Sequence, residues 1–526
     1  MVVPIYATTL TGLINEFLAE YAAAHPAQAA ALGLPPPAVI GEHSPAALTM
    51  RLARYRTMSA ALNQLIPQTT AEQLDAAILR WQLEWAIWQL STWQPQWHDP
   101  RYYTGLVFID LRRLQTTDAD EQAAVLAELR AIPGLLETAR ANLRRPLSRL
   151  AIEETLIALQ LNAATLGSAP LTGRELRTAA RVARTSLAAF SHFLQVEHLP
   201  AAIDEVGLGR DNFNGWLQFA EQISLTPERL HVLGEAEIRR QRDMLRSIAP
   251  RRDYRHLIRT LAIDHPSADR VIDELRTAIT QARNLVARNP IVSLIDIDVP
   301  PVTEAPPSAR WATLSLIPPG RCGRATVVVS LPDPDWPPDE QAAWLRAFGR
   351  AALTIAAFHE AYPGHYLHLG HIARAPGHLA RYFWSGCHLE GWAHYSERMA
   401  MDIEPGLANP RLLVAVAAEA LLRACRLVVA VELHTGTIDL AAAAERFRDE
   451  AGLDPYLAQR EARRAALDPG VICYTLGRLA IERLCERMRQ RWGEHFSLRR
   501  FHDAILAFGA PPLPVLNRLL AAGDML

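Results

Sequence analysis

The sequence predicts a mainly α-helical fold with a small antiparallel β element. Apolar residues recur at helical spacing over most of the chain, and proline or glycine interrupts the pattern at short intervals. Strand-like runs are expected only after Pro290, where residues 311–317 and 325–331 flank a Pro-Gly turn. Half of the 526 residues are hydrophobic, so the chain can bury a large core.

The predicted helices begin and end at local signals. A helical pattern over residues 10–32 ends at Gly33, and Thr226-Pro227 supplies the cap and first-turn proline of a helix that reaches residue 248. Asp468-Pro469 opens a late helix in the same way. Further helices are expected over residues 44–66, 70–93, 118–194 (as three or four helices), 266–288, 410–432, 440–451 and 455–467.

The change in character near residue 290 predicts two regions of the chain. Residues 1–290 would form a helical N-terminal region. Residues 291–526 would form a second region that carries the β element and a histidine-rich segment. One continuous domain is the alternative, because large helical proteins of this length occur in either form.

Composition narrows the classes of partner and location. The net charge of −2 argues against nucleic acid or an anionic membrane as the main partner. All 54 basic residues are arginine, which excludes a Schiff-base lysine and a phosphate-loop lysine. The five cysteines are odd in number and include no C-x-x-C pair, which predicts that the protein is located in the reducing cytoplasm. The first residues lack the basic segment of a signal peptide, and no apolar run is long enough to cross a membrane.

A histidine-rich segment is the strongest chemical signal. Seven of the eighteen histidines lie between His359 and His394. The segment begins His359-Glu360, as zinc-peptidase helices of the H-E-x-x-H type do, in which two histidines bind zinc and the glutamate activates water. Here the second histidine is His365, two positions later than usual, and Pro363 stands in its place.

The spacing of this variant motif needs a break in the helix. A single helix is expected from Pro338 onward, with an apolar stripe that ends at His359. Residues six apart on a straight helix point about 120° away from each other, so His359 and His365 could not then share a metal. A Pro-Gly bulge at 363–364 would bring His365 back to the ligand position. The alternative is a kinked core helix whose histidines bind no metal.

A third ligand is needed for a catalytic zinc site, and Glu390 is the best candidate. It lies in the segment H-L-E-G-W-A-H-Y-S-E, which ends at Glu397. Glu397, two helical turns later, would either orient a ligand histidine or form a solvated charge. The remaining histidines of the segment are rival ligands: His368, His371, His388 and His394.

The pairing of H-E-A-Y-P-G-H with E-G-W-A-x-Y-x-E resembles the bacterial family called domain of unknown function 885 (DUF885). The resemblance covers most of the chain. It implies a metallopeptidase fold similar to the angiotensin-converting-enzyme and neurolysin gluzincins, with two helical lobes around a deep cleft. It also implies His359, His365 and Glu390 as the metal ligands and Glu360 as the general base.

A late motif, from Asp468-Pro469-Gly470 to Tyr474, also resembles this family. The phenol of Tyr474 would hydrogen-bond a developing oxyanion if it lies near the metal, and otherwise it is a packed helix residue.

These observations predict a zinc-dependent hydrolase, most directly a peptidase that cuts short or unstructured peptides. The peptide is expected to lie along an open edge of the strand at residues 325–331. The alternatives are a metal hydrolase of another amide or ester, and a non-catalytic helical binding protein with a relic metal site.

Overall fold

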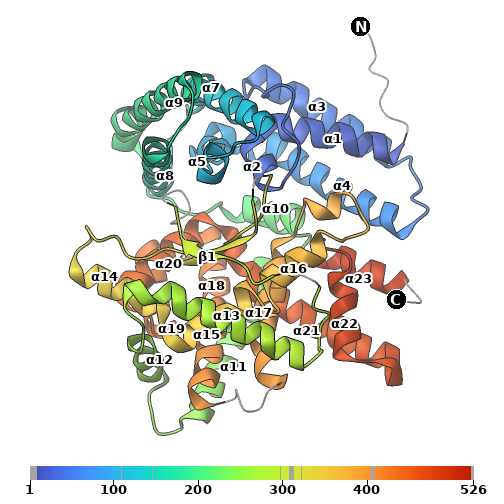
Figure 1. The fold of residues 1–526 in the computed structure, drawn as a ribbon, viewed down its shortest axis with the longest axis vertical. Helices are drawn as coiled ribbons and strands as arrows, with labels where there is room; N and C mark the ends of the chain where they lie inside the picture. Colours follow the sequence, from blue (N-terminus) through green and yellow to red (C-terminus); the bar gives the residue numbers. More distant parts are fainter. Residues whose placement is uncertain are drawn as a thin grey trace. The chain divides into compact units, whose positions relative to one another are not determined.

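The computed structural model is mainly helical, as the sequence predicts, and carries one small sheet (Figure 1). The structure does not describe the first eight residues, Trp311 or Cys322, so the predictions that concern these residues stay predictions. The chain divides into two compact units. The structure describes residues 9–107, 109–144, 146–295, 298–306, 313–321, 323–403 and 409–522.

Unit 1 comprises residues 1–205, 305–311 and 318–325. The expected helix over residues 10–32 divides at His25, because Pro26 cannot donate the next backbone hydrogen bond. A capping box between Thr69 and Glu72 starts α4. The α-helices are α1 (Leu10–Ala24), α2 (Pro26–Ala31), α3 (Pro45–Leu62), α4 (Thr70–Trp88), α5 (Arg101–Leu106), α6 (Leu111–Leu114), α7 (Ala119–Asn142), α8 (Arg149–Ser168) and α9 (Arg174–Phe193).

Unit 2 comprises residues 206–304, 312–317 and 326–526. It therefore includes α10 to α13, which lie before the predicted division at residue 290. Its α-helices are α10 (Arg210–Ala220), α11 (Pro227–Ile248), α12 (Tyr254–Ile263), α13 (Val271–Arg288), α14 (Pro338–Leu345), α15 (Arg350–Glu360), α16 (His365–Ile372), α17 (Gly386–Ile403), α18 (Pro410–His434), α19 (Leu440–Ala451), α20 (Pro455–Leu467), α21 (Cys473–Trp492), α22 (Leu498–Leu506) and α23 (Leu513–Ala522).

The helix α18 forms the centre of unit 2. Most of its residues are buried, and it packs against α11, α15, α17, α19, α20 and α21 (Figure 1). Its sequence is apolar on every side except for a few arginines and glutamates, as expected of a helix with neighbours all round it. Two of the helices that carry the histidine motif, α15 and α17, therefore rest on a buried scaffold.

The β element differs from the predicted two-stranded antiparallel unit. It has three strands, β1 (Val302–Glu304), β2 (Leu314–Ile317) and β3 (Thr326–Val329), in the order β1-β3-β2. The strand β2 pairs with β3 antiparallel as predicted, but β1 pairs with the other edge of β3 in parallel. The prediction of a peptide along an open edge of residues 325–331 is therefore wrong, because both edges of β3 are occupied.

The expected single helix before the motif is also interrupted. The helix α14 passes into a 3-10 turn at Arg346–Phe348, and α15 starts only at Arg350. The backbone amide of Arg350 donates to the carbonyl of Asp264, and its guanidinium pairs with Asp264 and Glu274. A tertiary contact therefore supplies the partner that a continuous helix would have supplied. No helix among the described residues is long and apolar enough to span a membrane.

Candidate metal centre

The two motif histidines come from two consecutive helices. His359 lies in the last turn of α15, and His365 is the first residue of α16. The connection turns back so tightly that a Cβ atom on Gly364 would lie 1.9 Å from the carbonyl oxygen of His359. Only glycine fits there, so the Pro363-Gly364 pair allows a closer return of the chain than a helix would. The two imidazole centroids lie 4.7 Å apart.

The three predicted ligands converge on one point. Glu390 projects from α17, and its Oε2 atom lies 3.5 Å from Nε2 of His359 and 3.2 Å from Nε2 of His365. Ligands with bonds of about 2.1 Å to one tetrahedral ion are separated by about 3.4 Å. These distances match that spacing, and the three residues form one of two groups of possible metal ligands in the described part of the chain.

Electrostatics link the three groups. Burial opposes a charge on His359, but the nearby carboxylates of Glu390 and Glu397 raise the pKa of His359 to about 9. Burial would raise the pKa of Glu390, yet the charge of His365 and the contacts with His359 hold it well below its usual range. The carboxylate thus stays ionised, and two imidazoles direct ring nitrogens at it, as at a divalent cation site.

Glu397 organises the far side of His359. Its Oε1 atom lies 2.6 Å from Nδ1 of His359 and 2.8 Å from Nη2 of Arg423, and its Oε2 atom lies 3.2 Å from Nδ1 of His394. It is buried, so the solvated charge that was the alternative does not apply. Arg423 and the two imidazoles hold the pKa of Glu397 well below its usual range despite burial. Glu397 therefore fixes the ring orientation that leaves Nε2 of His359 facing Glu390.

The predicted base directly follows His359 in the sequence, and the predicted oxyanion donor lies against the His359 ring. Glu360 ends α15, is buried, and its Oε2 atom has no hydrogen-bond partner among the described residues. The ring of Tyr474, in the first turn of α21, stacks on His359 at a centroid distance of 6.1 Å. Burial and the charge of Glu390 raise the pKa of Tyr474 to about 12, so the phenol keeps its proton at neutral pH.

Three arginines that the sequence analysis did not single out surround Tyr474. The guanidinium carbons of Arg423, Arg426 and Arg464 lie 5.6, 5.4 and 5.9 Å from its ring centroid. Arg464 also donates from Nη2 to the phenol oxygen at 3.0 Å. The sequence signal was present in α18, where Arg423 and Arg426 are one turn apart in an otherwise apolar run.

The four rival histidines lie outside the cluster and have other partners. His368, His371 and His388 each have one ring nitrogen within 3.2 Å of a backbone carbonyl oxygen. His394 contacts Glu397 instead. Burial lowers the pKa values of His388 and His394 to about 4 and about 3, so both rings are neutral. Their contacts are structural, and none replaces a predicted ligand.

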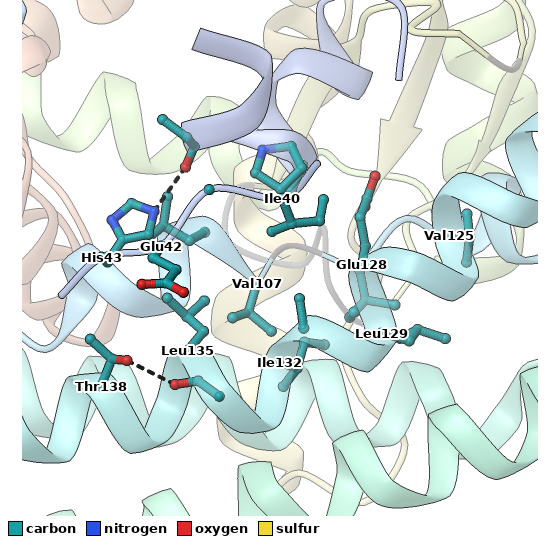
Figure 2. Close-up of a pocket in the computed structure, with 18 of the residues that line it drawn as sticks. Ile40, Glu42, His43, Val107, Val125, Glu128, Leu129, Ile132, Leu135 and Thr138 are labelled. Carbon is teal, nitrogen blue, oxygen red and sulfur yellow. Dashed lines mark hydrogen bonds between the residues drawn. The ribbon is translucent and has the colours of Figure 1, made fainter. Parts of the chain in front are cut away.

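Unit 1 contains a separate cavity of about 370 Å³ (Figure 2). Figure 2 shows Leu129 and Ile132 among its apolar walls, with His43 and Glu128 at its sides. His43 lies 3.0 Å from the carbonyl oxygen of Ala24 and 2.8 Å from the Tyr102 hydroxyl, and Glu128 pairs with Arg113. Both of these polar side chains therefore already have protein partners.

Comparisons with known proteins agree on family and fold. No curated protein matches the chain. A solved structure described as a predicted lipoprotein of unknown function from Shewanella oneidensis is 21% identical, with a TM-score of 0.79, covering 98% of this chain and 100% of its own. A predicted lipoprotein from Colwellia psychrerythraea is 19% identical, with a TM-score of 0.75, covering 97% of this chain and 98% of its own. At these identities, the similarity concerns the fold alone.

The profile of a bacterial protein family of unknown function matches residues 26–520, which include both motifs and the late tyrosine segment. The match covers nearly the whole chain, so the family resemblance seen in the motifs is confirmed. The chain belongs to the bacterial family DUF885.

Proposed function

We propose that the protein is a zinc-dependent hydrolase that acts on short or unstructured peptides. The observation that carries the proposal is the convergence of Nε2 of His359, Nε2 of His365 and Oε2 of Glu390. The Glu390 oxygen is buried and has no hydrogen-bond partner within the described ranges, although two imidazoles face it. Two histidines and one carboxylate are a donor set of catalytic zinc sites, so the residues fit the ion.

Each neighbouring residue then has a defined task. A zinc ion held by the cluster would supply Lewis acidity and lower the pKa of a water molecule. Glu360 would accept a proton from water at its partnerless carboxylate oxygen and return it to the leaving group. The phenol of Tyr474 donates a hydrogen bond to the oxyanion of the substrate, and Arg464 holds the phenol oxygen in place.

A metal analysis and a digest of a peptide library test this proposal. The wild type should bind one zinc ion per chain and cut short peptides. Glu360→Gln should keep the zinc ion and lose activity by about 10²–10⁴-fold, because an amide cannot take up the proton. Glu486→Gln, an exposed glutamate on α21, is the matched control and should behave as wild type.

The other outcomes of the experiment are equally specific. Cleavage of simple esters or acyl amides without peptide cleavage would assign the protein to another class of metal hydrolase. Bound zinc with no hydrolysis of any of these substrates would identify a binding protein. Full activity of Glu360→Gln would remove Glu360 from the mechanism.

The cytoplasmic location remains a prediction from cysteine content. We propose this location for the chain. The alternative is that the chain is exported, because the two similar structures are described as lipoproteins. Fractionation of the source cells with an antibody to this chain separates the two.

A further inference from the structure

Two buried thiols from distant parts of the sequence meet in unit 2. Cys387 lies in the first turn of α17, and Cys473 is the first residue of α21. Their sulfur atoms lie 3.3 Å apart although 86 positions separate them in the chain. Both side chains are buried. Two sulfur atoms at this distance are in direct contact, with no room for another atom between them.

A buried carboxylate holds the Cys387 end of the pair. The two oxygens of Glu221 accept hydrogen bonds from the backbone amides of Gly386 and Cys387 and from the hydroxyl of Ser385. Glu221 therefore caps the start of α17 and uses both of its oxygens in doing so. This contact fixes the backbone at Cys387 and hence the position of its sulfur atom relative to α21.

The same three residues, Glu221, Cys387 and Cys473, lie close enough to form a second group of possible metal ligands. The protein surroundings disfavour a metal there. Thiols bind metals as thiolates, and the pKa of Cys387 is raised to about 11: the hydrogen bond with Cys473 lowers it, but burial and the charge of Glu221 outweigh that effect. Burial also raises the pKa of Cys473 well above its usual value. The oxygens of Glu221 are already engaged, which leaves too few donors for a zinc site.

We propose that Cys387 and Cys473 are a disulfide-forming pair that joins the start of α17 to the start of α21 when the chain folds under oxidising conditions. The sulfur contact must shorten to about 2.05 Å, which asks for side-chain rotation and a small adjustment between two helix ends. The proposal stands independently of the proposed hydrolase activity.

The reaction is a thiol–disulfide exchange with a low-molecular-weight disulfide such as oxidised glutathione. The thiolate of one cysteine attacks the reagent, forms a mixed disulfide and releases one reduced thiol. The second cysteine thiolate then displaces the other reduced thiol and forms the protein disulfide. The two cysteines lose two electrons and two protons in total, and the reagent takes them up. Because both thiols are buried, exchange requires the unfolded chain or a local opening.

The position of the bond connects it to the candidate metal centre. Cys387 precedes Glu390 by one helical turn, and Cys473 is directly followed by Tyr474. The two helices also touch at a glycine crossing, where a Cβ atom on Gly391 would lie 2.4 Å from Cα of Gly477. The disulfide would hold together the two helix ends that present Glu390 and Tyr474.

The test uses the full chain, refolded with oxidised and reduced glutathione or with dithiothreitol alone. Each sample is denatured, alkylated and weighed as an intact protein. The chain has five cysteines, so the reduced sample should take up five alkyl groups. The oxidised sample should take up three, because two are joined, and a digest should yield one peptide pair that links positions 387 and 473.

Variants provide the controls. Cys387→Ser and Cys473→Ser should lose this linked pair, whereas Cys425→Ser, a buried cysteine on α18, should keep it. The thermal midpoint of the oxidised wild type should exceed that of the reduced form by about 2–5 °C, and Cys387→Ser should abolish the difference.

Three results would overturn the proposal. One is full alkylation of all five cysteines after oxidative refolding. Another is a bond that joins other cysteines. The third is zinc that protects both thiols from alkylation until a chelator is added, which would instead identify Glu221, Cys387 and Cys473 as a metal site.

Discussion

At the scale of single residues, a buried carboxylate arranges the side chains around the candidate metal centre. Glu397 contacts His359, His394 and Arg423 at once. Arg423 in turn stands over the ring of Tyr474. The orientation of His359 and the position of the phenol are thus coupled through one charged network in a buried site, where such contacts are stronger than at the surface.

Tyr474→Phe tests the oxyanion role. The variant should keep its zinc ion, and kcat should fall by about 10²–10³-fold with little change in KM, because in the proposed mechanism the phenol acts on charge that develops only in the transition state. Tyr254→Phe is the matched control. The Tyr254 hydroxyl lies in the same unit and donates a hydrogen bond to the backbone carbonyl of Glu450. An unchanged kcat in Tyr474→Phe would show that the phenol is a packing residue.

The lowered pKa of His43, which lies beside the cavity of unit 1, predicts that the protein loses stability in mild acid. Burial and the charge of Arg51 lower the pKa of His43 to about 4, although its contact with the Ala24 carbonyl opposes the shift. The His43 side chain therefore takes up a proton near pH 6.5 in the unfolded chain but only near pH 4 in the folded chain. The contribution of His43 to stability should be unchanged above pH 6.5 and should fall below it, by about 2 kcal/mol at pH 5.

Denaturant unfolding at pH 7 and pH 5 measures this effect on the wild type and on His43→Gln. The variant should lose less stability between the two pH values, because its side chain does not titrate. An NMR titration that places the pKa of His43 near 6.5 would contradict the prediction.

At the scale of elements, the site depends on how helices meet. The helices α17 and α21, which carry Glu390 and Tyr474, are in contact along their first turns. A Cβ atom on Gly477 would lie 1.9 Å from the carbonyl oxygen of Cys387. Small residues on both sides therefore set the distance between these two helices, and hence the distance between a proposed ligand and the proposed oxyanion donor.

Gly477→Ala should destabilise the protein by more than about 2 kcal/mol, because an added methyl group forces the two helix backbones apart. Gly134→Ala is the matched control in a different helix: no atom lies within 4 Å of its Cβ position, and it should raise stability by up to about 1 kcal/mol. Thermal and denaturant unfolding measure both changes. Equal stability of Gly477→Ala and wild type would show that the two helices can accommodate the added methyl group without separating.

At the scale of the whole molecule, the candidate centre belongs to one unit. His359, His365, Glu390 and Tyr474 all lie in unit 2, whereas the cavity of Figure 2 lies in unit 1. A ligand that binds only the folded form stabilises the part of the chain to which it is bound. Zinc binding should therefore raise the stability of unit 2 and leave the stability of unit 1 unchanged.

Hydrogen exchange with and without zinc tests this link. Zinc at 100 times its Kd should add about 2.7 kcal/mol of protection to peptides from α15 to α17 and α21. Peptides from α7 to α9 in unit 1 should exchange at the same rate in both samples, as an internal control. His365→Ala should remove the effect, and equal protection of unit 1 peptides would argue against a site within unit 2.

The sequence by itself determined the helical class, most helix starts and the residues of the cluster. These features depend on local chemistry. Proline and a capping side chain start a helix, and the two histidine–glutamate motifs are recognised by the spacing of their residues along the chain. The tight return at Gly364, which places His359 and His365 side by side, was also signalled locally by the Pro-Gly pair.

The tertiary structure alone decided the features that depend on distant partners. The short strand β1 has no distinctive pattern, so its pairing with β3, which closes the predicted peptide edge, could not be foreseen. The contact between Cys387 and Cys473 joins positions 86 apart and leaves no C-x-x-C signature. Arg464 reaches Tyr474 from a separate helix. Sequence periodicity reports which face of an element is buried, but it does not report what that face meets.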